Sequence, residues 1–147
     1  MQKLIMPILL ALFLSGCASV KMASTDRDMQ SKIFKTEPDR ANIYIYRNEY
    51  FGAAIKVPVS INGLDLGSTG AKTYFHLNVP PGIYHLNSSA ENDSKVHLNV
   101  EKGKNYFIWQ EMKMGFIYGR TRLTNVDEVT GRAGVSESQL LETSVKF

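Results

Sequence analysis

The pattern of apolar and polar positions divides the chain into three stretches. Leu4 to Leu14 is an uncharged apolar run, and residues 18–41 are polar and of mixed charge. From Asn42 onward, apolar residues recur at every second position, with many β-branched and aromatic side chains. Because successive side chains of a strand point to opposite faces, this period predicts β-structure for most of the chain.

Eight short strands are predicted, separated by turn sequences such as Asn62-Gly63 and Pro80-Pro81-Gly82. Their ranges are 42–47, 57–61, 64–67, 73–79, 83–89, 95–100, 105–112 and 121–126. Regularly spaced short strands favour an all-β fold, here an antiparallel β-sandwich of about seven to eight strands. Ser136 and Gln139 fit a capping box, which predicts a short C-terminal helix over 137–142.

The predicted strand that contains Tyr106 to Trp109 is apolar on both faces. The favoured interpretation is a central strand whose outer face is covered by the 127–147 tail. The tail offers four apolar side chains for this cover: Val129, Val135, Leu140 and Leu141. The alternative is an outer face that binds a partner.

The N-terminus has the pattern of a secretion signal. Lys3 precedes the apolar run, which is too short to span a bilayer as a stable helix, and Leu14-Ser15-Gly16-Cys17 follows at once. This sequence resembles a bacterial lipobox, in which small residues admit a peptidase and the cysteine thiol takes the lipid. The alternative is an ordinary signal peptide followed by an unrelated cysteine. The lipobox predicts a cleaved signal over 1–16, a flexible lipidated tether over 17–41 and a β-sandwich domain over 42–147.

Ala18 follows the predicted lipidation site. Aspartate at that position tends to retain bacterial lipoproteins in the inner membrane, so Ala18 resembles the outer-membrane pattern. We therefore expect a protein of the cell envelope, anchored through Cys17 at the periplasmic face of the outer membrane.

Composition limits the partners of the mature chain. Cys17 is the only cysteine, so neither a disulfide nor a cysteine metal ligand is expected. Loss of Lys3 with the signal leaves 16 basic and 14 acidic side chains, with no long run of one sign. This balance gives no electrostatic support for nucleic-acid binding, and no cofactor is expected.

Three histidines, His76, His85 and His97, invite a metal-site hypothesis. The apolar residues of their strands face inward, so all three are predicted to face outward. Pairing consecutive strands core against core places His76 opposite Asn87 and His85 opposite Asn99, which makes a polar His/Asn face. His76 and His97 would then lie about 9.5 Å apart, too far to share one zinc ion. The favoured interpretation is a solvated face, and the weaker alternative is a metal or small-ligand site.

Catalytic motifs are missing from the sequence. There is no Gly-x-Ser-x-Gly nucleophile elbow, although Glu111 and the pair Asp127-Glu128 supply carboxylates. Adjacent strand residues point to opposite faces, and acids at a helix start cap more often than they catalyse. The chain is therefore not expected to be an enzyme.

The candidate contact surface lies in two long connections, 48–56 and 113–120. Their apolar side chains are Tyr50, Phe51, Ile55, Met114, Phe116, Ile117 and Tyr118. Loops with this content on a rigid scaffold are frequently contact surfaces, and the alternative is that they fold back and plug the open end of the sandwich. If consecutive strands alternate in direction, both loops face away from Cys17, which favours a protein partner over membrane insertion.

Four short sequences carry a resemblance to a known family: Tyr46-Arg47, the Pro81-Gly82 hairpin, the Gly103-Lys104 turn and Gln110-Glu111 after an aromatic strand. With the stretches around them, over about residues 40 to 135, the chain resembles the domain of unknown function 2846 family. The family comprises small bacterial proteins, many of them lipoproteins, and it has no established activity. The resemblance therefore implies a lipoprotein and no particular reaction.

These observations predict a lipid-anchored envelope protein whose β-sandwich is a non-catalytic binding or structural module for another envelope component. The alternative is a small-ligand or metal-binding protein that uses the outward His/Asn face. A hydrolase is a distant third, and a deep polar pocket containing Glu111 or Asp127 would favour it.

Overall fold

The computed structural model describes residues 20–147, so the predicted signal and Cys17 lie outside the described range. The elements in chain order are α1 (Thr25–Ser31), β1 (Ala41–Arg47), β2 (Val57–Ile61), β3 (Leu64–Thr69), β4 (Thr73–Val79), β5 (Gly82–Ser89), β6 (Asp93–Val100), β7 (Asn105–Lys113), β8 (Arg120–Val126), α2 (Glu128–Ser136) and β9 (Gln139–Leu140). All eight predicted strands are present, with bounds within two residues of the prediction. No helix within residues 20–147 has the length and apolar character needed to cross a membrane.

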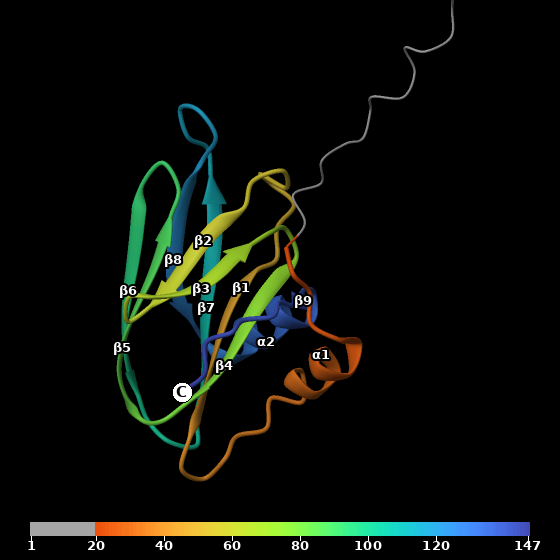
Figure 1. The fold of residues 1–147 in the computed structure, drawn as a ribbon, viewed down its shortest axis with the longest axis vertical. Helices are drawn as coiled ribbons and strands as arrows, with labels where there is room; N and C mark the ends of the chain where they lie inside the picture. Colours follow the sequence, from red (N-terminus) through yellow and green to blue (C-terminus); the bar gives the residue numbers. More distant parts are fainter. Residues whose placement is uncertain (1–19) are drawn as a thin grey trace, which may run out of the picture.

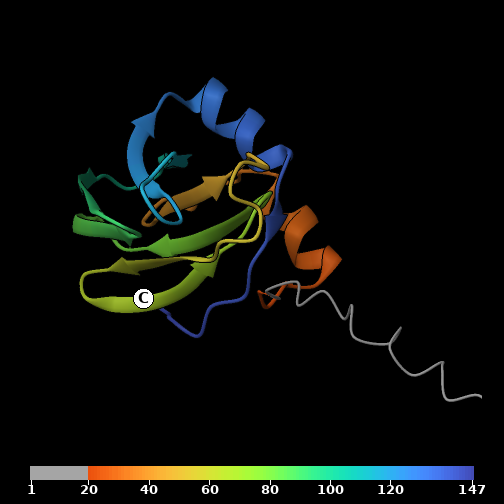
Figure 2. The ribbon, with the colours of Figure 1, turned by 90° about the horizontal axis from the view of Figure 1, so that it is seen from above.

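The strands form two packed sheets, which confirms the β-sandwich (Figure 1). One sheet has the order β8-β7-β1-β4-β9 and the other β3-β2-β5-β6. Most neighbours are antiparallel, but β1 runs parallel to β7 and β4 runs parallel to β9. Seen from above, α1 and α2 lie on the outer side of the five-stranded sheet (Figure 2).

The predicted pairing of the fourth strand with the fifth is wrong. β4 pairs with β1 and β9, whereas β5 pairs with β2 and β6. The Pro80-Pro81-Gly82 turn therefore connects the two sheets instead of closing a hairpin. Two successive prolines supply no backbone N–H, which fits a connection that leaves the hydrogen-bonded ladder.

Apolar residues form two cores, one on each face of the five-stranded sheet. Alternate residues of β1 enter different cores: Ile43 and Ile45 face the four-stranded sheet, and Tyr44 and Tyr46 face the helices. Every residue of β1 is consequently buried. Phe107 of β7 joins the helix-side core, which confirms that the C-terminal tail covers the outer face of this strand.

The C-terminal helix is confirmed, but it lies earlier than predicted. α2 spans 128–136, and the chain at 137–142 holds β9 instead of a helix. Asp127 caps α2, because its Oδ1 accepts a 2.9 Å hydrogen bond from the Thr130 N–H. Of the apolar residues expected to cover the sheet, Val135, Leu140 and Leu141 are buried, whereas Val129 is exposed.

The flexible tether expected over residues 17–41 is contradicted for the part that the structure describes. Met22 forms a β-bridge with Leu141, and the Ala23 N–H donates a 2.9 Å hydrogen bond to the Leu140 carbonyl. α1 follows, and the side chain of Phe34 then packs into the helix-side core. The physical reason is the width of the apolar outer face, which α2 covers only in part, so the N-terminal segment covers the remainder.

Candidate functional site

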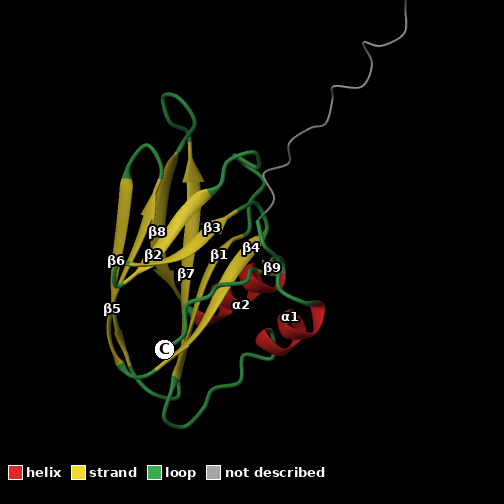
Figure 3. Cartoon of the chain, in the orientation of Figure 1, coloured by secondary structure: helices red, strands yellow, loops and turns green. Residues whose placement is uncertain are grey.

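Two loops lie at one end of the sandwich (Figures 1 and 3). Both carry exposed apolar side chains. The first connects β1 to β2, and the second connects β7 to β8. The exposed fractions are 100% for Phe116, 88% for Ile117, 81% for Met114, 73% for Tyr50, 50% for Phe51 and 49% for Tyr118. We call these six side chains the apolar loop end. Their exposure favours a contact surface over loops that fold back and plug the open end of the sandwich.

Ile55 departs from the other predicted contact residues. It is half-buried, and a Cβ placed on Gly52 or Gly119 would meet its Cδ1 at 3.6 and 3.7 Å. Ile55 therefore packs between the bases of the two loops and joins them. The alternative interpretation, in which the loops fold back and plug the open end, expected this packing of all seven residues.

Arg47 braces the first loop from within. Its side chain is fully buried, and its guanidinium donates hydrogen bonds to the carbonyls of Ile55 at 2.8 Å, Phe51 at 3.0 Å and Gly52 at 2.6 Å. Desolvation lowers the pKa of Arg47, and the nearby Glu49 carboxylate acts in the opposite direction. An arginine remains protonated under such conditions, so a buried cation holds the loop by its backbone.

Glu91, in the β5–β6 turn, braces the second loop. Its carboxylate accepts hydrogen bonds from the Ile117 N–H at 2.6 Å and the Gly119 N–H at 2.9 Å. The Glu91 N–H in turn donates to the Gly119 carbonyl at 3.1 Å. A turn of one sheet therefore fixes the loop of the other. The exposed tip between Met114 and Tyr118 stands on a rigid base.

A chain of buried polar side chains links the two sheets. The Gln110 amide donates to the Ser88 hydroxyl at 2.7 Å, and that hydroxyl lies 2.7 Å from the Thr121 hydroxyl. The Thr69 hydroxyl donates to the Gln110 side-chain oxygen. All four side chains are buried and paired with one another, so they fix the alignment of the sheets and are closed to a substrate.

The position of Val20 corrects the expected orientation of the molecule. Val20 lies beside Gly70 in the β3–β4 turn and lines a cleft of about 550 Å³ together with Tyr50 and Lys72. Residues 20–40 pass along the outer face before β1 begins, so the described chain starts at the same end as the loops (Figure 1). The prediction that the loops face away from Cys17 is not supported by residues 20–40, and Cys17 itself lies outside the described residues.

The structure does not bring the three histidines together. His85 and His97 are direct cross-strand partners on the exposed face of β5 and β6, with their Nδ1 atoms 3.1 Å apart. His76 lies in the other sheet, opposite Tyr44, so the predicted pairings of His76 with Asn87 and His85 with Asn99 are wrong. Within residues 20–147, no group of three or more histidine, cysteine and acidic side chains is placed to hold a metal ion.

His76 is held in its neutral form by its surroundings. Its ring stacks on Tyr44 at a centroid distance of 4.5 Å, and its Nε2 lies 3.0 Å from the Asn42 Oδ1, which accepts a hydrogen bond. Burial lowers the pKa of His76 to about 4, and the positive charge of Arg27 acts in the same direction.

This depressed pKa predicts a loss of stability in acid. The unfolded chain protonates His76 near pH 6.5, so the contribution of this residue is complete above that pH and is lost as the pH falls toward 4. Between pH 7.5 and 4.5, we expect the free energy of unfolding of His76→Gln to fall by about 2 kcal/mol less than that of the wild type. Urea unfolding at the two pH values measures this difference, and equal losses in both proteins would contradict it.

The carboxylates that the sequence singled out have structural partners. Glu111 lies 3.5 Å from the Lys113 ammonium, and Asp127 caps α2. Hydrogen bonds from Thr130 hold the pKa of Asp127 below its usual range.

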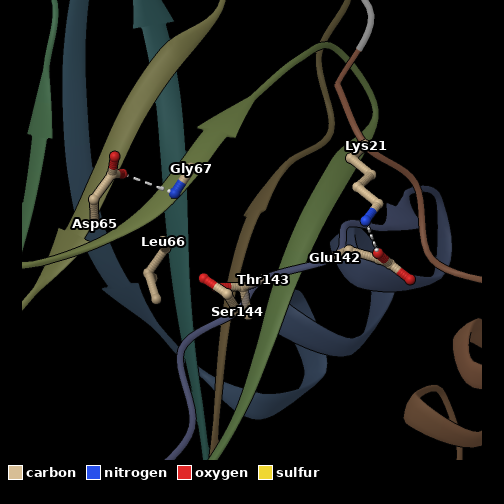
Figure 4. A pocket seen from close by; sticks show the side chains of 7 residues that line it. All are labelled: Lys21, Asp65, Leu66, Gly67, Glu142, Thr143 and Ser144. Atoms are coloured by element: carbon tan, nitrogen blue, oxygen red, sulfur yellow. Dashed lines mark hydrogen bonds and ion pairs between the residues drawn. The ribbon is translucent and has the colours of Figure 1, made fainter.

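A cleft of about 390 Å³ lies between β3 and the C-terminal segment, away from both of these acids (Figure 4). Its two carboxylates are also paired: Glu142 forms a 2.9 Å ion pair with Lys21, and Asp65 accepts a 2.8 Å hydrogen bond from the Gly67 N–H.

The two residues that brace the loops, Arg47 and Glu91, were not predicted from the sequence as site residues. Arg47 carried a signal, because a charged residue closing the apolar segment 42–46 must find buried partners or leave the core. Nothing in the sequence indicated the role of Glu91, since its partners are backbone N–H groups 26 and 28 positions away.

Comparison with known proteins places the chain in a family. The model of the family described as "Protein of unknown function (DUF2846)" matches residues 37–120, which include both loops. An "Uncharacterized protein" of Haemophilus influenzae (strain ATCC 51907 / DSM 11121 / KW20 / Rd) is 33% identical over 130 residues, covering 86% of this chain and 77% of the relative. No solved structure matches the chain. The chain therefore belongs to the DUF2846 family of proteins of unknown function.

Proposed function

We propose that this protein is a lipoprotein of the cell envelope, anchored through Cys17, whose sandwich is a non-catalytic binding or structural module. The observation that carries the proposal is the apolar loop end. Six large apolar side chains are held in solvent by a buried arginine and a bridging glutamate, although both loops could have folded inward. Large apolar side chains that are exposed on a rigid base are typical of a site that binds another component.

The lipid anchor is supported by the N-terminal sequence. The run from Leu4 to Leu14 is followed at once by Ser15-Gly16-Cys17, and Ala18 fits sorting to the outer membrane. The non-catalytic role is supported by the acids, because Glu111 and Asp127 have structural partners. We infer no second function from the His85–His97 pair, since a protein zinc site takes three or four ligands.

The proposal is tested in cells with a photo-reactive benzoylphenylalanine at position 116. We expect the chain to incorporate a labelled fatty acid, to fractionate with the outer membrane and to form adducts with an envelope component on irradiation. Cys17→Ser should lose the label and leave a soluble or uncleaved protein, because no other thiol is present. Benzoylphenylalanine at Ile83, which is 65% exposed at the start of β5, is the matched control and should give no adduct.

Two outcomes would contradict the proposal. If the Cys17→Ser chain stays in the membrane fraction at its mature mass, the protein is not anchored through Cys17. A labelled chain whose position 116 yields no more adduct than position 83 would show that the loop end is not a contact surface.

A further inference from the structure

The distance between the anchor and the loop end decides what this surface can reach. Val20 lies three positions after Cys17, and an extended chain spans at most about 11 Å over that length. Val20 is fixed to the domain, because Lys21 and Met22 beside it bond to Glu142 and Leu141. A lipid on Cys17 would therefore hold the domain close to the bilayer, with the loop side of the molecule nearest.

The loop tip also has the composition of a membrane-contacting segment. Met114, Phe116 and Ile117 are almost fully exposed and consecutive in the chain apart from Gly115. Side chains of this kind enter the boundary between headgroups and acyl chains when they project from a folded domain. Tyr50 and Tyr118 are suited to that boundary because each has an apolar ring and a polar hydroxyl.

A pair of basic residues lies immediately behind the tip. Lys113 ends β7 and Arg120 begins β8, and the two are direct cross-strand partners with exposed side chains. Like charges in that position repel each other, and Glu111 offsets part of this charge from 3.5 Å. Anionic headgroups would relieve the repulsion at the depth where the apolar tip enters the boundary region.

We propose that the apolar loop end inserts into the headgroup region of the same bilayer leaflet that holds the Cys17 lipid, so that its partner is the lipid surface. This inference rests on the proposed function, because the lipid on Cys17 supplies the first attachment and the loops supply the second. The sandwich is then fixed in orientation on the membrane. The turns at 80–82 and 101–104, at the end of the sandwich opposite the β7–β8 loop (Figure 1), would then point into the periplasm.

The experiment uses the lipidated chain reconstituted into vesicles of phosphatidylethanolamine and phosphatidylglycerol. Phe116→Trp and Ile83→Trp each add one tryptophan to the native Trp109. Lipids brominated near the headgroup should quench at least half of the added fluorescence at position 116 and leave that at position 83 unchanged. Without the lipid, Cys17→Ser should still bind these vesicles weakly. Adding Phe51→Ser and Phe116→Ser should reduce that binding about tenfold, whereas adding Ile83→Ser and Val129→Ser should not.

The possible failures are distinguishable. If the chain is lipidated but positions 116 and 83 are quenched equally, the membrane inference is overturned. Protein adducts at position 116 would then leave the proposed function intact with a protein partner. If Cys17 carries no lipid, the proposed anchor and the inference fall together. The tryptophan measurement does not depend on whether the serine variants fold.

Discussion

Arg47→Ala is expected to lower the free energy of unfolding by about 4 kcal/mol, the largest effect we anticipate for one side chain. The change removes three hydrogen bonds from a charged donor and leaves three loop carbonyls without their partner. It also opens a cavity where a fully buried side chain had been. Equilibrium denaturation in urea measures the loss.

Arg47→Lys separates the two contributions to that loss. Lysine keeps the charge, but its single ammonium cannot reproduce a planar fork that spans three carbonyls. We expect an intermediate loss of about 2 kcal/mol, together with faster hydrogen exchange over residues 48–56. Arg122→Ala, at an exposed position of β8, is the control and should change stability by less than about 0.5 kcal/mol. If Arg47→Ala were as mild as this control, the guanidinium would not be what holds the loop.

The positions of the strands along the chain could be predicted because the alternating apolar pattern is local. Which strands lie side by side in a sheet could not be predicted. The period of two locates β1 and β7 but does not reveal that they lie side by side and parallel, with Tyr44 opposite Phe107. Such a contact joins residues more than 60 positions apart, and no turn between them fixes the register. Of the consecutive strands, β2–β3, β5–β6 and β7–β8 pair with each other, whereas β1–β2, β3–β4, β4–β5 and β6–β7 do not.

The histidines show how a small error in register changes a candidate site. His85 was predicted to lie opposite Asn99, but it pairs with His97, a shift of two residues. A two-residue shift keeps every side chain on its predicted face, so His85 and His97 are outward as expected. It nevertheless changes their partners and brings the two rings into contact.

The orientation of the loop end could not be derived because it depends on residues 20–41. Their polar composition is typical of a tether, but in the structure they pack on the domain, as the positions of Phe34 and Met22 show. Once this segment packs on the outer face, the start of the described chain moves to the loop end. With Cys17 lipidated as proposed, the six exposed residues of the apolar loop end then favour a lipid surface over a protein on the far side.

Gly134→Ala is expected to lower the free energy of unfolding by about 3 kcal/mol, although alanine is the better helix former by about 1 kcal/mol. A Cβ at this position would lie 2.1 Å from the Cε2 atom of Tyr46, whose ring is buried beneath α2. The helix must move away from the sheet or the ring must leave its place, and either change opens the helix-side core. Ser136→Ala, exposed on the same helix, is the control and should have little effect.

A second background distinguishes this clash from a general sensitivity of α2. Tyr46→Leu removes the ring atoms that the new methyl group would meet, so Gly134→Ala should be at least 1 kcal/mol less destabilising in that background than in the wild type. Thermal or urea unfolding of the four proteins gives the coupling energy. A coupling near zero would mean that the glycine serves the backbone of α2 and not its close approach to Tyr46. A substantial coupling would confirm that Gly134 is required for the helix to cover the sheet.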